Sequence, residues 1–133
     1  MSDERALADR LGFTPGQQTL EIGWDEDTDQ ALRESVEEVT GQELLDEDSD
    51  EEADVLLVWF RDDDGDLTDT LVDAGSRLAD GGTVWLLTPK VGRDGHVEPS
   101  DIGEAADTAG FNAMKSVSAA PDWSATKLAA GKH

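Results

Sequence analysis

Cysteine and tyrosine are absent from this chain of 133 residues. Without cysteine the chain forms no disulfide, binds no metal through thiolates and uses no thiol nucleophile, so its stability must come from packing. Long apolar runs are also missing, because the longest one, at residues 55–60, has six residues and a membrane-spanning helix needs about 20. With no apolar N-terminal segment either, the sequence predicts a cytoplasmic protein that does not bind membranes.

Basic residues are scarce. Ten lysines and arginines stand against 32 aspartates and glutamates, which gives a formal net charge of −22. Residues 1–80 contain 26 acidic and 5 basic residues (net −21), whereas residues 81–133 contain 6 and 5 (net −1). Because lysine and arginine supply most of the affinity for phosphates, we expect no direct binding to nucleic acid. The charge indicates a basic protein partner instead.

The spacing of apolar residues predicts helices alternating with strands. Helical spacing marks four segments: residues 3–11, 27–40, 67–78 and 100–109. Strand patterns mark three segments before the C-terminal part: residues 17–24, 54–60 and 83–87. Residues 111–119 and 123–130 are expected to form an antiparallel hairpin around Pro121. Ser100 is the expected N-cap of the last helix.

This order of elements predicts an α/β fold. The expected architecture is three-layer and Rossmann-like, with a mostly parallel sheet between helices and a C-terminal antiparallel β-hairpin. A chain of this length is expected to be one domain, residues 1–133. Residues 1–16 are assigned to an N-terminal helix and turn. Residues 42–54, with eight carboxylates in thirteen positions, are assigned to an acidic loop.

Residues 78–87, the Ala109-Gly110-Phe111 turn and the final hairpin resemble the back half of a class I S-adenosylmethionine methyltransferase. The resemblance covers residues 17–130 and implies that fold. In that family the first strand ends in an acidic-Gly-x-Gly-x-Gly loop, of which residues 21–26 keep only the first glycine, Gly23. Trp24 and two carboxylates stand where the backbone would approach the cofactor. The resemblance therefore implies a methyltransferase-like scaffold without a cofactor, with a vestigial methyltransferase as an alternative.

Four stretches together, residues 11–17, 62–66, 86–102 and 121–124, are similar to an uncharacterised actinobacterial family. That family is catalogued as a domain of unknown function (DUF3052-like). The resemblance implies an actinobacterial cytosolic protein. It implies no established activity, cofactor, partner or site residue.

The loop at residues 90–101 gathers cations and glycines in an otherwise acidic chain. Lys90, Arg93 and His96 precede the expected helix start at Ser100 and Asp101. A cationic, glycine-rich loop that leads into a helix can bind a phosphate group. The sequence therefore offers a site for a phosphorylated small molecule or nucleotide. The alternative is that Lys90 and Arg93 pair with the acidic surface and the glycines form turns.

A partner-binding surface is expected on the acidic loop, with tryptophans at element ends as anchors. Its candidate residues are Asp46, Glu47, Asp48, Asp50, Glu51, Glu52, Trp24 and Trp123. The alternative for Trp24 and Trp123 is packing at the edge of the core, where Trp59 and Trp85 are expected.

Residues 62–69 resemble part of an EF-hand loop, but the glycine register does not match. Acidic residues at the N-terminus of the following helix, where they interact favourably with the helix dipole, explain this stretch better. No metal site and no catalytic residue are predicted.

Three hypotheses about function follow. The first is a non-catalytic acidic interaction or regulatory protein that docks a basic partner. The second is a small-molecule binder at residues 90–101. The third is that the acidity reflects adaptation of a proteome to salt and carries no information about a partner.

Overall fold

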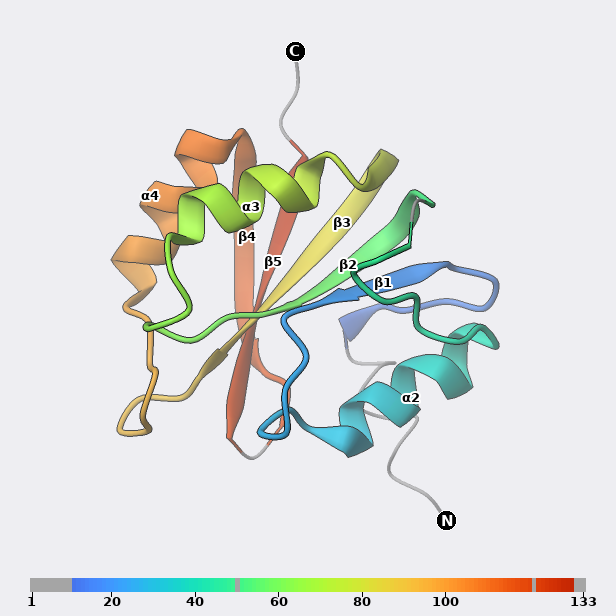
Figure 1. Cartoon of the computed structure of the whole chain (residues 1–133), viewed down its shortest axis with the longest axis horizontal. Coiled ribbons are helices and arrows are strands. Elements are labelled where there is room, and N and C mark those ends of the chain that lie inside the picture. Colours follow the sequence, from blue (N-terminus) through green and yellow to red (C-terminus); the bar gives the residue numbers. More distant parts are fainter. Residues whose placement is uncertain (1–10, 50, 121, 131–133) are drawn as a thin grey trace.

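The computed structural model describes residues 11–49, 51–120 and 122–130 (Figure 1). Of the helix expected at residues 3–11, all but Leu11 lies outside the described residues. The strands are β1 (Thr19–Ile22), β2 (Ala53–Trp59), β3 (Leu78–Pro89), β4 (Phe111–Ser118) and β5 (Trp123–Ala130). The helices with full bounds are α2 (Gln30–Thr40), α3 (Leu67–Gly75) and α4 (Pro99–Ala109). No described helix is long and apolar enough to cross a membrane.

The described strands form one five-stranded sheet in the order β1-β2-β3-β5-β4. β1, β2 and β3 are parallel, whereas β5 runs antiparallel to both of its neighbours. This confirms the α/β fold with a C-terminal antiparallel hairpin, whereas the sheet, expected to be mostly parallel, is parallel only at β1, β2 and β3. The two strands of the hairpin do not enter the sheet in the order of the chain, because β5 lies next to β3 and β4 forms the edge.

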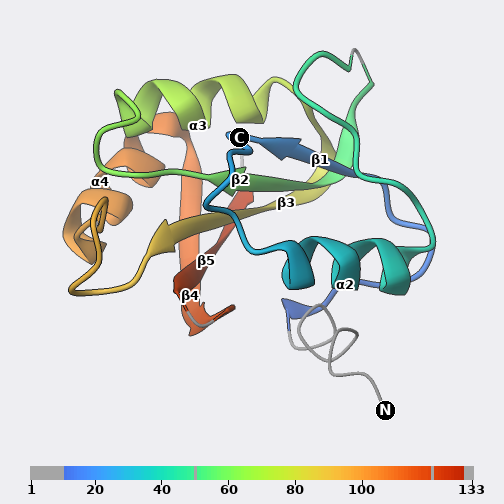
Figure 2. The ribbon, with the colours of Figure 1, turned by 60° about the horizontal axis from the view of Figure 1, so that its bottom comes forward.

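Helices cover the two faces of the sheet and make the fold three-layered (Figure 2). α2 packs on one face, where Leu32, Val36 and Val39 meet Trp59 and Trp85 of the strands. α3 and α4 pack on the opposite face in a second core that includes alternate residues of β1, β2 and β3. The near-continuous apolar pattern of β2 follows from this burial on both faces.

The start of β3 differs from the prediction. α3 ends at Gly75, and β3 already begins at Leu78, so Gly81 and Gly82 lie in the strand and do not end a helix. Ala53 of β2 pairs with Leu78 and Val55 pairs with Thr83, which makes a bulge. A β-carbon at Gly82 would lie 2.7 Å from the carbonyl oxygen of Asp54. Glycine permits this close approach of two strands, a common role for glycine in bulges.

Helix starts are capped unequally. Asp29 and Asp66 are the N-caps of α2 and α3, and each side chain accepts a backbone hydrogen bond. The expected cap of α4 is wrong, since Glu98 is the N-cap residue and its side chain makes no capping hydrogen bond. Pro99 at the first helical position fixes the backbone there instead, and Ser100 lies one residue further into the helix.

Replacing Asp29 by alanine is expected to lower the free energy of unfolding by about 1 kcal/mol. The reason is that the Asp29 Oδ1 atom accepts a hydrogen bond from the Leu32 N–H at 2.9 Å, and alanine leaves that donor without its partner. Urea denaturation followed by tryptophan fluorescence measures the change. Glu98→Ala is the matched control, because it removes an N-cap residue that makes no such bond. Equal losses in both variants would contradict the prediction.

The acidic loop is held to the sheet at several points. Leu45 forms a parallel bridge with Leu20 of β1, which covers part of the outer edge of that strand. Arg77, just before β3, donates a hydrogen bond to the carbonyl oxygen of Glu47. Consequently Glu47 and its neighbours lie beside the carboxyl end of β1.

Candidate functional site

A cavity of about 310 Å³ opens at the carboxyl ends of β1 and β2. In open α/β sheets this is the end of the strands where ligands usually bind. We refer to this cavity as the strand-end pocket. Its walls are formed by β1 and the loop after it, by the acidic loop, and by the end of β2 with the segment that follows. The lining residues are Ile22, Gly23, Trp24, Asp25, Glu47, Trp59, Phe60, Arg61, Asp64 and Thr70.

Gly23 begins the loop above the pocket in a conformation that other residues avoid. Its φ is +82°, and a β-carbon there would lie 2.2 Å from the carbonyl oxygen of Trp59. Its N–H donates to Glu47 Oε2 at 2.8 Å. The one glycine retained from the methyltransferase-like pattern therefore serves a close approach between β1 and β2 and holds the acidic loop.

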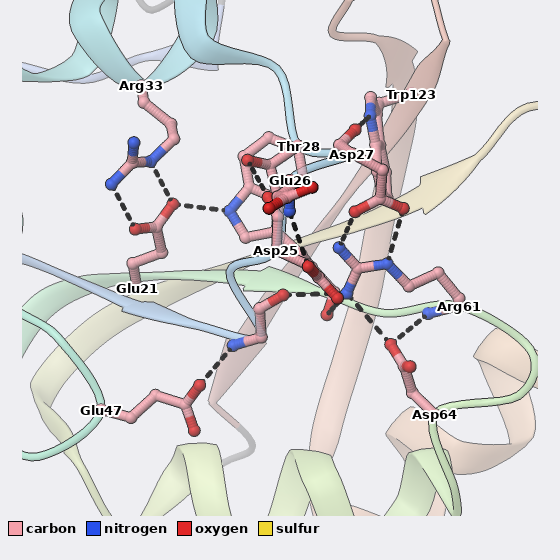
Figure 3. Close-up of polar contacts among 12 residues, drawn as sticks. Glu21, Asp25, Glu26, Asp27, Thr28, Arg33, Glu47, Arg61, Asp64 and Trp123 are labelled. Atoms are coloured by element: carbon pink, nitrogen blue, oxygen red, sulfur yellow. Dashed lines mark hydrogen bonds and ion pairs between the residues drawn. The ribbon is translucent and has the colours of Figure 1, made fainter.

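Arg61, the residue after Phe60, lines the pocket, and Figure 3 shows its guanidinium between the carboxylates of Asp27 and Asp64. Its side chain is largely buried, and its guanidinium makes two hydrogen bonds to the carboxylate of Asp27. Its Nη1 atom donates to the Gly23 carbonyl oxygen at 2.8 Å and to Asp64 Oδ2 at 3.1 Å. The guanidinium carbon also lies 5.3 Å from the ring centre of Trp123. These contacts join the loop after β1, the end of β2 and the start of β5.

A second ion pair, with a buried carboxylate, lies beside the first (Figure 3). Glu21 of β1 accepts hydrogen bonds from Arg33 Nε at 2.7 Å and Nη2 at 2.9 Å. Its Oε2 atom also accepts from Trp59 Nε1 at 2.8 Å. Glu21 is thus satisfied entirely by α2 and β2, and its carboxylate ties the two elements together.

Arg61, Asp27 and Asp64 form a group that we call the Arg61 cluster. Their contacts shift the pKa values of Asp27 and Arg61. Hydrogen bonds from Arg61 hold the pKa of Asp27 below its ordinary value, although burial acts in the opposite direction. Burial alone would lower the pKa of Arg61, but its hydrogen bonds with Asp27 and Asp64 raise it overall. At neutral pH both groups are therefore charged, and the pair is intact.

The pocket is unsuited to an anion. Three carboxylates line it, from Asp25, Glu47 and Asp64, against one guanidinium, and that guanidinium is already paired. Trp24 adds an aromatic wall that is 52% exposed. Within the described parts of the chain, no group of three or more histidine or acidic side chains is arranged to hold a metal ion. Chemically, the pocket favours a positively charged group.

The residues of the 90–101 loop are not brought together into one cavity. Lys90 Nζ donates to Ser118 Oγ at 2.6 Å, and Arg93 pairs with Asp122 at 3.1 Å. The His96 ring nitrogen Nδ1 lies 2.9 Å from the carbonyl oxygen of Pro89. Ser100 and Asp101 are exposed in the first turn of α4. Arg93 lines one cavity, of about 240 Å³, whereas Asp101 lines another.

Two of the candidate partner-binding residues share the strand-end pocket, Trp24 and Glu47. Asp46, Asp48, Glu51 and Glu52 are exposed in the acidic loop, and Asp50 lies outside the described residues. Trp123 differs from the exposed anchor expected from the sequence, because it is 3% exposed and packs edge-on against Trp59 at 4.8 Å. Its indole N–H donates to the carbonyl oxygen of Asp27. It is a core residue, as are Trp59 and Trp85.

The sequence pattern did not predict the Arg61 cluster or the ion pair between Glu21 and Arg33. One signal was present, since Glu21 interrupts an otherwise buried strand and Arg61 directly follows another. A charged residue at such a position is either exposed or paired. The partners Arg33 and Asp27 come from segments 12 and 34 residues away in the sequence.

Comparisons with known proteins agree with this architecture. An uncharacterized protein of Mycobacterium bovis is 53% identical over 121 residues, which cover 91% of this chain and 76% of that protein. The solved pyocyanin biosynthetic protein PhzM superposes with a TM-score of 0.72 at 11% identity, over 96% of this chain and 54% of that one. The CcbJ methyltransferase from Streptomyces caelestis superposes with a TM-score of 0.63 at 11% identity, over 98% and 90%.

The structural likeness is one of fold, because the identities are low. This chain also spans only about half the length of PhzM. A family model described as "Protein of unknown function (DUF3052)" matches residues 8–132. The chain therefore belongs to the DUF3052 family, on a scaffold shared with methyltransferases.

Proposed function

We propose that this protein is a non-catalytic docking protein of the cytoplasm that binds a basic partner protein through its acidic surface. The proposal rests on the balance of charges that line the strand-end pocket. Its single lining cation is paired with Asp27 and Asp64, and its carboxylates outnumber that cation. A ligand phosphate would meet net negative charge there, whereas a basic partner would meet complementary charge.

The exposed acidic loop extends this surface. Asp46, Asp48, Glu51 and Glu52 are exposed, and the contact between Glu47 and Gly23 places their loop beside the pocket. Exposed charges of one sign accelerate the encounter with an oppositely charged partner, and salt screens them. The binding is therefore expected to be strong at low ionic strength and weak at high ionic strength.

An affinity pull-down from the source cytosol, at low and at high salt, tests this proposal. We expect a basic protein to be retained at low salt, and retention to fall at least about tenfold in molar salt because screening shortens the range of the charges. A variant with four loop charges neutralised, D46N, D48N, E51Q and E52Q, should lose the partner. The matched control removes four exposed charges on α2 and α4, E34Q, E38Q, E104Q and D107N.

Two results would contradict the proposal. One is that the loop variant and the control variant retain the partner protein to the same extent. The overall charge would then be the only determinant of binding, as expected if the acidity reflects adaptation to salt. The other is a rise in melting temperature with S-adenosylmethionine or with a nucleotide, since a specific ligand stabilises the folded state by mass action. A rise that Lys90→Ala and Arg93→Ala abolish would instead support the small-molecule site at residues 90–101.

A further inference from the structure

We propose that the strand-end pocket binds one lysine or arginine side chain of the basic partner. This inference rests on the proposed function and names the contact at its centre. The pocket offers three features that a long cationic side chain needs: carboxylates, an accessible aromatic ring and apolar surface. They come from three separate segments of the chain, the loop after β1, the acidic loop and the end of β2.

The carboxylates have capacity for a further donor. Glu47 uses Oε2 to accept from Gly23, Asp25 uses Oδ1 to accept from Glu26, and Asp64 uses Oδ2 to accept from Arg61. Among the described residues, the second oxygen of each of the three has no donor. An ammonium or guanidinium group supplies several N–H donors together with the opposite charge.

Trp24 is the second and independent feature. It is a large aromatic residue with half of its surface exposed, in the wall of a cavity, where burial in the core would be the usual state. The Arg33 guanidinium carbon lies 5.7 Å from the centre of its ring, but Arg33 is paired with Glu21 and does not line the pocket. A tryptophan ring attracts cations through its π-electrons, most strongly where water is excluded.

The apolar part of the lining favours a side chain over an inorganic cation. The apolar residues Ile22 and Phe60 line the pocket together with the carboxylates. Lysine and arginine carry an aliphatic stem that packs on such surface while the charged end stays at the rim. A free metal ion has no such stem to pack on Ile22 and Phe60.

The test uses an acetylated and amidated hexalysine peptide, titrated into the full chain at low salt. We expect the indole N–H signal of Trp24 to move in two-dimensional NMR spectra, with the backbone signals of Gly23 and Asp25. Trp85, buried in the core, is the internal reference. Trp24→Phe assigns the indole signal, and Trp24→Ala should weaken the binding by about fivefold.

The decisive comparison uses two double variants. Each removes two negative charges, one variant at the pocket and the other on α4. Asp25→Asn with Glu47→Gln keeps a side-chain acceptor at each position, so the hydrogen bonds to Glu26 and Gly23 remain possible. Glu104→Gln with Asp107→Asn removes the same charge from the exposed side of α4. We expect the first variant to bind the peptide at least about tenfold more weakly, and the second to change the affinity by about twofold or less. Unchanged melting temperatures show that both variants are folded.

The remaining outcomes overturn the inference in distinguishable ways. Equal losses in the two double variants, with no shift of the Trp24 signal, would mean that docking is spread over the acidic surface, and the proposed function would stand without this site. Absence of any salt-sensitive binding to the peptide would overturn both. Displacement of the peptide by S-adenosylmethionine would assign the pocket to a small molecule and also overturn both.

Discussion

Gly23→Ala is expected to destabilise the protein by roughly 3 kcal/mol or more, a large part of the stability of a typical domain. Two effects add. The residue has a φ of +82°, which strains any residue with a β-carbon, and the new methyl group would lie 2.2 Å from the carbonyl oxygen of Trp59. Because β1 is paired with residues 55–58 of β2 and Trp59 is paired with Leu87 of β3, that oxygen cannot move without disturbing the sheet.

Gly41→Ala separates the two effects. Gly41 has a similar φ of +75° at the end of α2, but no atom lies within 4 Å of the place that a β-carbon would occupy there. It should therefore lose only about 1 kcal/mol. Urea denaturation of both variants, followed by tryptophan fluorescence, gives the difference. If the two variants lost the same stability, the close approach between β1 and β2 would not be a constraint.

Arg61→Met is expected to lower the free energy of unfolding by about 2–3 kcal/mol. Fully buried pairs lose roughly 3–5 kcal/mol when one partner is removed, but the carboxylates of Asp27 and Asp64 are partly exposed and keep some hydration. The carbonyl oxygen of Gly23 also loses its donor. Arg61→Lys should recover less than half of the loss, because an ammonium group cannot reproduce the two parallel bonds to Asp27.

Arg93→Met is the control for Arg61→Met. It breaks an ion pair with Asp122 in which both side chains are 54% exposed. Such pairs contribute little, so the change should stay within about 0.5 kcal/mol. A loss in Arg93→Met as large as that in Arg61→Met would contradict the central position assigned to the Arg61 cluster.

The stability difference between the protein and Arg61→Met should depend on pH. Since Arg61 lowers the pKa of Asp27 in the folded state, the pair stabilises the fold above the pKa of an unfolded aspartate, near 4. This stabilisation is lost as the pH falls through the lower folded-state pKa. The two proteins should therefore approach each other in stability under acid conditions. An NMR titration of Arg61→Met should show the pKa of Asp27 shifted upward.

Local pattern was sufficient for most of the elements. The apolar run of β2, the periodicity of α2 and the two halves of the hairpin follow from spacings of two to four residues, and the structure confirms them. Residues 78–82 were interpreted as the end of a helix because a glycine pair stops helices and also makes bulges. Only the pairing of Ala53 with Leu78 distinguishes the two roles.

The fold class, the acidity, its concentration in the first 80 residues and the loss of the glycine-rich loop can all be predicted from the sequence alone. All of these depend on composition or on neighbours along the chain. The three-dimensional arrangement was needed to show that Trp24 and Glu47 share a pocket, that Trp123 is buried, and that Arg61 is paired with Asp27. The physical reason is that the fold brings together segments far apart in the sequence, and a charged side chain changes its role when a distant carboxylate neutralises it.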